Sequence, residues 1–467
     1  MMNNTRHSLY IYIIMCIAVL TAAKSEAQQR TGYFMENYDL RHEMNPAFQP
    51  DSSYWSLPVL GNTQVSMHST MRMGDILYRQ ENGKLTTFMT KGTVSKAKLL
   101  DAVGSGMKAG ADVQLTLLSM GQRVDNRRYR TASVSIKATA ASWLPKSLFD
   151  CMKEMENRDY SISNTKAKSS LYMEVAAGES RRLSERLTVG AKAKLLLGLM
   201  NMNAELKNMH LDMTDDGNGW TASGRAQINV AGMKYKQGRK KYDSSDEYYD
   251  YVSGVDVQSP TLSGVGAALD AGVTYRVDDR LTLSAAVTDL GFIAWTANHR
   301  AVNKGEPFMF DGFKDVSIED GSDKKLDKQW DEIHDDLMNL MNLEQRHHST
   351  YTSMLGATVT VGAEYNLKEF CNSRIGAMLT HRVDGKYSWT ELRLNGTATP
   401  IADVPLDVAV SPAYSTFGFS GGIMINYYPN KKLSLFLGSD CVFLKVNPQM
   451  IPTSMNGSLQ LGLTFRM

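Results

Sequence analysis

Histidine and acidic side chains are the groups in this 467-residue chain that could bind a metal ion or act as an acid–base pair. His347 and His348 follow a segment that carries Asp335 and Asp336, and imidazole and carboxylate groups are common metal ligands. The two histidines are adjacent, however, and neighbouring positions on a helix do not face the same way. We therefore predict no metal site here, and the sequence indicates no cofactor.

The other candidates for catalysis are isolated from one another. His68, His210 and His381 have no serine or carboxylate partner that spacing identifies, and the chain has no GxSxG, HExxH or P-loop motif. A serine–histidine pair assembled only by folding stays open. We predict that the protein is not an enzyme. The net charge of +2 also gives no reason to expect a nucleic acid partner, which would favour a clustered basic surface.

Cysteine and methionine are the remaining side chains with distinctive chemistry. Cys151, Cys371 and Cys441 lie far apart and lack CxxC spacing, which argues against a disulfide framework and against a zinc site. We expect each to be a small apolar filler. The 28 methionines allow two interpretations, an adaptable lining for apolar ligands or a replacement for leucine on apolar surfaces, and we favour the second.

The N-terminal segment has the features of an export signal. Basic residues precede an apolar run from Leu9 to Ala23, and a small-x-small cleavage site ends at Ala27. A membrane anchor is the rival interpretation, but the run is shorter than the ~20 residues that a spanning helix needs. We predict that residues 1–27 are a signal peptide and that the mature protein is exported.

The rest of the chain is dominated by segments that alternate apolar and polar residues. The sequence LTVGAKAKLLLG at residues 187–198 places Val, Ala and Leu on one face and mostly Gly and Lys on the other. Strands with one face suited to lipid and one suited to a wet lumen are typical of transmembrane β-barrels, whereas a soluble sandwich prefers bulkier residues on its apolar face. We predict about fourteen such strands, near residues 60–72, 111–123, 129–141, 168–178, 187–199, 264–276, 281–296, 351–365, 373–382, 387–399, 406–414, 418–428, 433–445 and 457–467.

The lengths of the connections alternate as well. Every second connection is short, such as VDDR at residues 277–280, whereas several of the others are long, above all 200–263 and 297–350. Short periplasmic turns and long outer loops are the asymmetry expected of a bacterial outer-membrane barrel. Tyrosine and tryptophan at the strand ends fit aromatic girdles at the two membrane interfaces. The sequence thus predicts an all-β antiparallel barrel in contact with outer-membrane lipid.

The long connections carry local structure of their own. Residues 200–231 are expected to form an extended hairpin, and residues 145–157 a short helix. Residues 323–345 have apolar side chains at helical spacing beside many acidic ones, which predicts an amphipathic helix in an outer loop. We favour a lid on the barrel rim for this helix over a docking site for a partner.

The last strand of the chain alternates up to its final residue. Leu461, Leu463, Phe465 and Met467 fall on one face. We expect this strand to pair with the first one, near residues 60–72, so that no sheet edge is exposed to lipid. Its apolar residues resemble the C-terminal signal that the barrel-assembly machinery binds, although that signal usually ends in an aromatic residue.

The segment YFMENYDLRHEMNPAF at residues 33–48 resembles the corresponding part of FadL-type outer-membrane proteins. That superfamily includes transporters of hydrophobic compounds and the PorV-like barrels of a secretion system. Together with LTVGAKAKLLLGLMN and LTLSAAVTDLGFIAW, the segment looks like that of an uncharacterised outer-membrane family of the Bacteroidales. The only short motif shared with the FadL transporters is Asn45-Pro46-Ala47.

The resemblance implies a division of the mature chain into two parts. Residues 28–56 would be a plug, held in the lumen by Asn45, Pro46, Ala47 and Phe48, and residues 57–467 would be the barrel. In FadL-type transporters a hydrophobic ligand passes from an outer pocket to a side opening in the wall. The leading expectation is therefore passive uptake of a small hydrophobic or amphipathic compound. The alternative is a PorV-like scaffold that presents loops 232–262 and 297–350 to envelope protein partners.

Overall fold

The structure is a computed structural model. It describes residues 30–80, 83–154, 156–213, 220–241, 248–257, 260–303, 308–310, 343–346, 350–367, 372–401, 404–430, 432–442 and 455–467. The predicted signal peptide, the histidines at 347 and 348, and most of the predicted helix at 323–345 lie outside these residues. Where the predicted helix at 323–345 was expected to end, Glu344–Arg346 form a short strand, β17.

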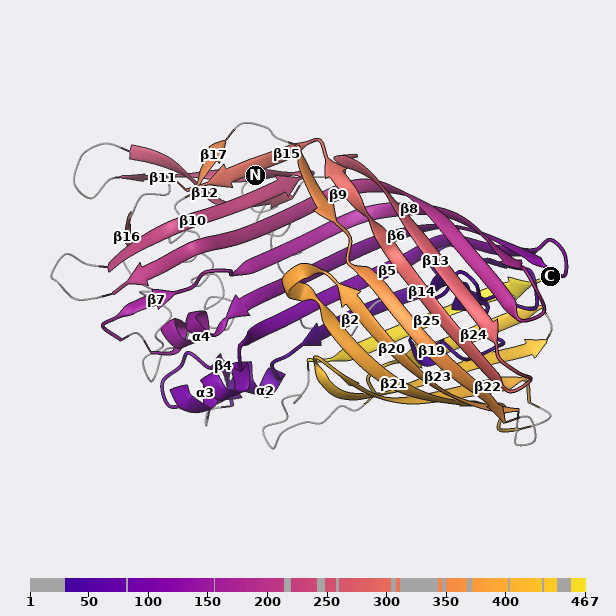
Figure 1. Cartoon of the computed structure of the whole chain (residues 1–467). Coiled ribbons are helices and arrows are strands. Elements are labelled where there is room, and N and C mark those ends of the chain that lie inside the picture. The colour runs from indigo at the N-terminus through magenta and orange to yellow at the C-terminus, as the bar shows by residue number, and fades with distance from the viewer. Residues whose placement is uncertain are drawn as a thin grey trace.

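Fourteen antiparallel strands close a barrel, as predicted (Figure 1). They are β2 (Thr63–Ser69), β5 (Gly106–Arg123), β6 (Arg128–Pro145), β8 (Lys166–Arg182), β9 (Leu187–Asp212), β13 (Gly264–Arg276), β14 (Leu281–Trp295), β19 (Ala357–Leu367), β20 (Ser373–Val383), β21 (Trp389–Ala398), β22 (Leu406–Ser415), β23 (Gly418–Asn430), β24 (Leu433–Ser439) and β25 (Gly457–Arg466). Two short strands extend this sheet: β1 (Tyr54–Ser56) precedes β2, and β18 (Tyr351–Met354) precedes β19. Each of the predicted segments overlaps one of the fourteen strands, and β5, β6, β8 and β9 extend beyond the predicted ranges.

The barrel is sealed between its last and first strands. β25 pairs with β24 on one side and with both β1 and β2 on the other. On the outer face of this seam, Trp55 stacks on Phe465 with 4.7 Å between ring centroids. β1 already belongs to the sheet, so pairing with the barrel begins within the segment 28–56.

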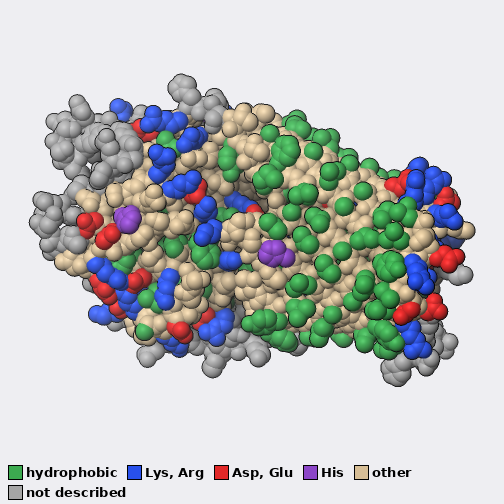
Figure 2. Space-filling view, in the orientation of Figure 1, with side chains coloured by type: hydrophobic (Ala, Val, Ile, Leu, Met, Phe, Trp, Pro, Cys, Tyr) green, Lys and Arg blue, Asp and Glu red, His purple; other side chains and the backbone are tan. Residues whose placement is uncertain are grey.

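The strands separate a lipid-facing surface from a polar interior, as their alternation predicts. Hydrophobic side chains form a broad apolar band on the face of the barrel that Figure 2 shows, and many leucine, valine and isoleucine side chains of the strands are exposed. Lys137, Lys192 and Lys194 lie on the opposite face and are largely buried in the lumen. This is the fold of an outer-membrane β-barrel. Among the described residues, no helix is long and apolar enough to cross a membrane.

The long connections pack together at one end of the barrel, where they form a compact unit that we call the cap (Figure 1). Its elements are α2 (Met73–Ile76), β3 (Leu77–Arg79), β4 (Leu85–Thr87), α3 (Lys96–Val103), α4 (Lys146–Lys153), β7 (Asp159–Ser161), β10 (Trp220–Ala231), β11 (Met233–Lys241), β12 (Tyr248–Val257), β15 (Asn298–Val302), β16 (Phe308–Phe310) and β17, with the far end of β9. α4 and the β9–β10 hairpin confirm the predicted helix at 145–157 and hairpin at 200–231. At the other end of the barrel, four-residue turns join β5 to β6, β8 to β9 and β13 to β14.

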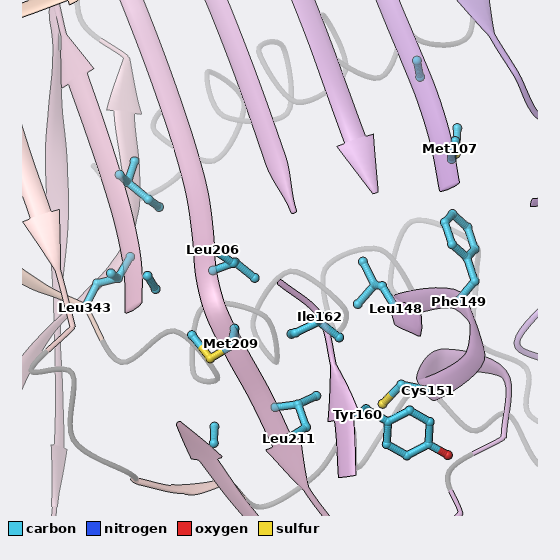
Figure 3. Close-up of a cluster of buried hydrophobic side chains, with 14 of the residues drawn as sticks. Met107, Leu148, Phe149, Cys151, Tyr160, Ile162, Leu206, Met209, Leu211 and Leu343 are labelled. Atoms are coloured by element: carbon cyan, nitrogen blue, oxygen red, sulfur yellow. The ribbon is translucent and has the colours of Figure 1, made fainter. Parts of the chain in front are cut away.

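The cap has a hydrophobic core of its own (Figure 3). Leu148, Phe149 and Cys151 of α4 meet Leu206 and Leu211 of β9 there. Cys151 is fully buried among these side chains, which fits its predicted role as an apolar filler. The described parts of the long connections therefore form one packed body on the barrel rim.

Candidate functional site

Residues 30–50, called the lumen segment below, lie inside the barrel toward the end with the short turns (Figure 1). Two 3-10 helices, η1 (Arg30–Gly32) and η2 (Asp39–Glu43), give the segment a compact shape. Tyr33, Phe34 and Leu40 are each only 1% exposed. They pack with apolar side chains on the lumen face of β20, β22, β23 and β24. The segment thus has an apolar core of its own within a polar lumen.

The Asn-Pro motif forms a tight turn against the wall. Asn45 Oδ1 accepts a hydrogen bond from Ala47 N at 2.9 Å, which closes the turn around Pro46. Asn45 Nδ2 donates to the carbonyl oxygens of Val273 on β13, at 3.5 Å, and Ala285 on β14, at 3.4 Å. One side chain therefore both shapes the turn and attaches it to two strands.

Two wall glycines make room for this turn. Gly190 on β9 and Gly272 on β13 are register partners, so they lie side by side on the lumen face. A Cβ at Gly190 would overlap the backbone of Pro46, and a Cβ at Gly272 would overlap the Asn45 side chain. The close approach of the turn depends on the absence of side chains at both positions.

Phe48 lies within the lumen segment, not against lipid. Its ring meets Tyr33 edge-on at 5.0 Å between centroids, and the Arg41 guanidinium lies 4.2 Å from its face. Burial lowers the pKa of Arg41, and the nearby Glu364 carboxylate on β19 opposes this shift. These contacts fold the segment back on itself around Phe48.

A buried charge network holds the start of the lumen segment. The Asp440 carboxylate accepts hydrogen bonds from the backbone N–H groups of Arg30 and Thr31, both at 2.9 Å. Arg393 of β21 bridges two carboxylates, with Nη1 3.5 Å from Asp440 Oδ1 and Nε 2.8 Å from Glu391 Oε1. Each buried charge has an opposite charge and hydrogen bonds, which buried ions require.

Two further ion pairs connect the segment to other strands. Arg466 of β25 places Nε 2.9 Å from Asp39 Oδ2. Arg374 of β20 contacts both Glu36 of the segment and Glu364 of β19. The attachments thus reach β19, β20, β21 and β25, so the segment is held from several sides of the lumen.

His42 is buried as a neutral imidazole. Lys192 Nζ lies 2.6 Å from the His42 carbonyl oxygen and 2.9 Å from its Nδ1, and the Tyr54 hydroxyl is 2.5 Å from its Nε2. Because an ammonium only donates, Nδ1 accepts and Nε2 carries the proton. Burial, together with the charge of Lys192, lowers the pKa of His42 well below its usual range.

The ladder between the first and last strands is irregular at the seam, although Leu463 N still donates to Leu60 O at 2.9 Å. Ser56 pairs with Thr464 and Thr63 pairs with Leu461, so six residues of the first strand, 57–62, face two residues of β25. This seam loop bulges toward lipid, where Leu60 is 51% exposed. Val59 has a φ of 65°, a conformation that a β-branched residue rarely adopts.

An apolar pocket of about 340 Å³ adjoins the seam loop on the outer face of the barrel, and we call it the seam pocket. Leu60, Leu435, Leu461 and the backbone at Gly462 line it. Phe436 also lines the seam pocket, and its ring packs edge-on against Tyr38 of the lumen segment at 5.1 Å. Phe436 therefore borders both the lipid-facing pocket and the lumen segment.

A second cavity, of about 330 Å³, lies inside the barrel between the lumen segment and the cap, and we call it the vestibule. Its walls include Lys166, Lys168, Asp289, Arg382 and Asp384. The described part of the lumen is therefore polar and charged, and the apolar pocket lies on the outside.

Comparison with known proteins places the chain in a family. A model of the family of unknown function DUF5723 matches residues 46–440, which is well over half of the chain. The chain belongs to this family. No curated protein matches it.

Solved structures resemble the DUF5723 fold at low identity. The Ralstonia pickettii toluene transporter TbuX has 10% identity and a TM-score of 0.43, with 91% of this chain and 92% of that chain covered. A Pseudomonas aeruginosa FadL homologue has 11% identity and a TM-score of 0.42, with 95% and 96% covered. For the P. putida toluene transporter TodX the values are 10% and 0.40, with 90% and 92% covered.

The candidate catalytic histidines are dispersed in this DUF5723 protein. His210 lies beside Asp159 at 3.1 Å on the surface of the cap, and His381 contacts Thr390 at 2.8 Å on the barrel wall. His68 packs against Phe417 at 4.4 Å between ring centroids. No group of three or more metal-ligating side chains occurs among the described residues. That the protein is not an enzyme stays a prediction.

The features that sequence reasoning missed are the seam loop, the seam pocket and the partners of the lumen segment. Glycine at the lumen-facing positions 190 and 272 was a visible signal for a close backbone approach, because a lumen face otherwise favours polar side chains. Pro58, just before the predicted first strand, was a signal for an irregular ladder there, since proline lacks the N–H donor.

Proposed function

We propose that this protein is a passive outer-membrane channel for a small amphipathic or hydrophobic compound, and that residues 28–56 are its plug. The observation that carries this proposal is the position of Phe436 between the seam pocket and Tyr38 of the lumen segment. An unobstructed barrel of this width would leak, so uptake requires a plug that moves or a route past it. The seam offers that route into the lipid.

The plug in this proposal is held by Asn45, Pro46, Ala47 and Phe48 on one side of the lumen. The opposite side is held through Asp39 by the seam strand β25. A shift of the plug away from Phe436 would open the wall at residues 57–62, where only part of the ladder is formed. The apolar residues Leu461 and Leu463 would then line the exit, and Phe465 and Met467 would complete the strand for recognition by the barrel-assembly machinery.

A reversible disulfide between plug and wall tests the proposal. The hydroxyls of Thr31 and Ser411 are 2.7 Å apart, which brings their β-carbons near bridging distance. The pair Thr31→Cys/Ser411→Cys is made in a background where Cys151, Cys371 and Cys441 are serine. Radiolabelled L-phenylalanyl-L-leucine or radiolabelled benzoate is added outside proteoliposomes that contain the protein, and its uptake into them is measured.

We expect oxidation to abolish uptake of whichever probe enters and reduction to restore it. The control pair Thr116→Cys/Ser135→Cys links β5 to β6 at hydroxyls 3.3 Å apart and leaves the plug free, so its uptake should not respond to oxidation. If neither probe enters faster than into protein-free vesicles, or if the locked barrel transports normally, the channel proposal is wrong.

The cap supports the alternative function, a scaffold for envelope protein partners. Its long loops are packed around a shared hydrophobic core, which gives a fixed surface to a partner (Figure 3). A scaffold would copurify with other envelope proteins in mild detergent, and replacement of the 232–262 connection by a short turn would release them. Isolation of the barrel alone under those conditions would contradict this alternative.

A further inference from the structure

The vestibule is lined by equal numbers of opposite charges. Four basic and four acidic side chains border its volume of about 330 Å³. Its size is at the lower end of the range for small-molecule sites. A net-neutral cavity with both signs on its walls favours neither a simple anion nor a simple cation. It suits a molecule that carries both charges.

Two neighbouring strands supply one wall of the vestibule as an ordered array. In the register of β8 and β9, Lys166 lies opposite Glu205, Lys168 opposite Asn203, and Ser170 opposite Asn201. All six residues line the cavity. The array therefore presents ammonium, carboxylate, amide and hydroxyl groups together on one face, with Lys166 Nζ paired to Glu205 Oε1 at 2.6 Å.

One buried hydrogen-bond donor in this wall has no partner among the described residues. Asn201 is 2% exposed and lines the cavity. Its Oδ1 accepts a hydrogen bond from Ser170 Oγ at 3.2 Å, whereas its Nδ2 has no hydrogen-bond partner among the described residues. A buried N–H group without an acceptor is costly, and a ligand carboxylate would satisfy it.

Groups suited to a cation lie beside Lys168 in the lining of the vestibule. Asp384 and Tyr387 both line the cavity, and Lys168 Nζ lies against both, 2.5 Å from Asp384 Oδ1 and 4.7 Å from the Tyr387 ring centroid. The position is therefore one where an ammonium group is already stabilised by a carboxylate and an aromatic face. A ligand ammonium would find the same partners if Lys168 turned toward the ligand carboxylate.

We propose that the vestibule binds a small zwitterion of dipeptide size, with its carboxylate on Asn201 and Lys168 and its ammonium between Asp384 and Tyr387. The inference rests on the proposed channel function, because it names the class of substrate that would enter. The seam pocket would accept the apolar part of such a molecule later along the route. Binding itself requires no movement of the plug.

Four dipeptide derivatives of nearly equal size test the charge requirement. They are L-alanyl-L-alanine, its N-acetyl derivative, its C-terminal amide, and the doubly blocked neutral form. Binding of each to the purified full-length barrel in detergent is measured by isothermal titration calorimetry. We expect the zwitterion to bind about tenfold more tightly than either singly charged form, and the neutral form to bind most weakly.

Asn201→Leu should weaken binding of the zwitterion and of the N-acetyl form by about tenfold and leave binding of the amide form unchanged. Asn395→Leu is the matched control, since Asn395 is also a buried lumen asparagine with an unpartnered oxygen but does not line the vestibule. Both variants are checked for folding by heat-modifiable gel migration. A variant that fails to fold is replaced by Lys168→Gln, which should weaken the same two ligands.

Equal affinity for all four derivatives, or no binding of the zwitterion, would overturn the inference. These outcomes are separable from failure of the channel proposal. Binding without uptake into proteoliposomes would leave the vestibule site standing and remove the channel. Uptake of benzoate without binding of the dipeptide would leave the channel proposal standing and remove the vestibule site.

Discussion

Arg466 on the last strand of the barrel and Asp39 in the lumen segment form an ion pair, with 2.9 Å between Nε and Oδ2. The same carboxylate accepts a hydrogen bond from Thr464 Oγ1 at 2.6 Å. The strand that closes the barrel therefore also holds the segment inside it. Formation of the seam and docking of the segment are coupled through one carboxylate.

Removal of Arg466 should destabilise the protein strongly. Arg466→Leu leaves Asp39 buried without its counter-ion, and breaking one side of a buried pair costs about 3–5 kcal/mol. Burial already raises the pKa of Asp39 against the pull of Arg466, so partial protonation of the carboxyl group will reduce this cost. The free energy of unfolding in urea is the measurement.

The double variant Asp39→Leu/Arg466→Leu separates the charge from the contact. It should recover most of the loss, because two apolar side chains of similar volume replace a buried pair at little cost. A double variant as unstable as Arg466→Leu would show that the ion pair is not the source of the effect.

Gly190 should tolerate no side chain. Gly190→Ala drives a methyl group into the Pro46 backbone, and overpacking of this kind costs about 1–3 kcal/mol. The lumen segment is expected to loosen, which limited proteolysis of the folded barrel would detect. Gly396→Ala is the control, because a Cβ there meets only Val410 at 3.8 Å. Equal protease resistance of both variants would contradict the packing argument.

Acid should weaken the hold on His42. Its pKa in the folded protein is well below the usual 6.5, so the unfolded chain binds the proton first as the pH falls. The contribution of neutral His42 is complete above pH 6.5 and declines below it. Asp39 and Glu43 have raised pKa values, so their contributions to stability change in the opposite direction at lower pH. Both residues are also present in the His42→Gln variant, so their effects cancel in the comparison.

His42→Gln removes this dependence while it keeps a polar side chain at the site. The difference in unfolding free energy between wild type and variant should shrink from pH 7.5 to pH 5. Parallel stability profiles for the two proteins over that range would show that folding does not shift the pKa of His42.

Shortening the seam loop should close the wall. Deletion of residues 58–61 leaves two residues opposite Gly462 and Leu463, which permits a continuous ladder between the first and last strands. The barrel should fold and remain heat-modifiable, whereas uptake into proteoliposomes should fall to the level of the disulfide-locked protein. Unchanged uptake would place the exit elsewhere.

The barrel itself was accessible from the sequence because its determinants are local. An alternation with a period of two, as in residues 187–198, sets which face of a strand meets lipid whatever its neighbours are. Loop lengths and the apolar last strand then indicated the number of strands and the closure. The same reasoning placed Lys192 and Lys194 in the lumen, since a charged side chain on the lipid face is costly.

What only the tertiary structure decided are the contacts between residues distant in the chain. Nothing local in Asn45 specifies the carbonyl groups of Val273 and Ala285, and nothing in Asp39 specifies Arg466, more than four hundred residues away. The six-against-two mismatch at the seam exists only once closure sets the register of both strands. Local periodicity determines which face a residue occupies, whereas closure of the barrel determines what it meets there.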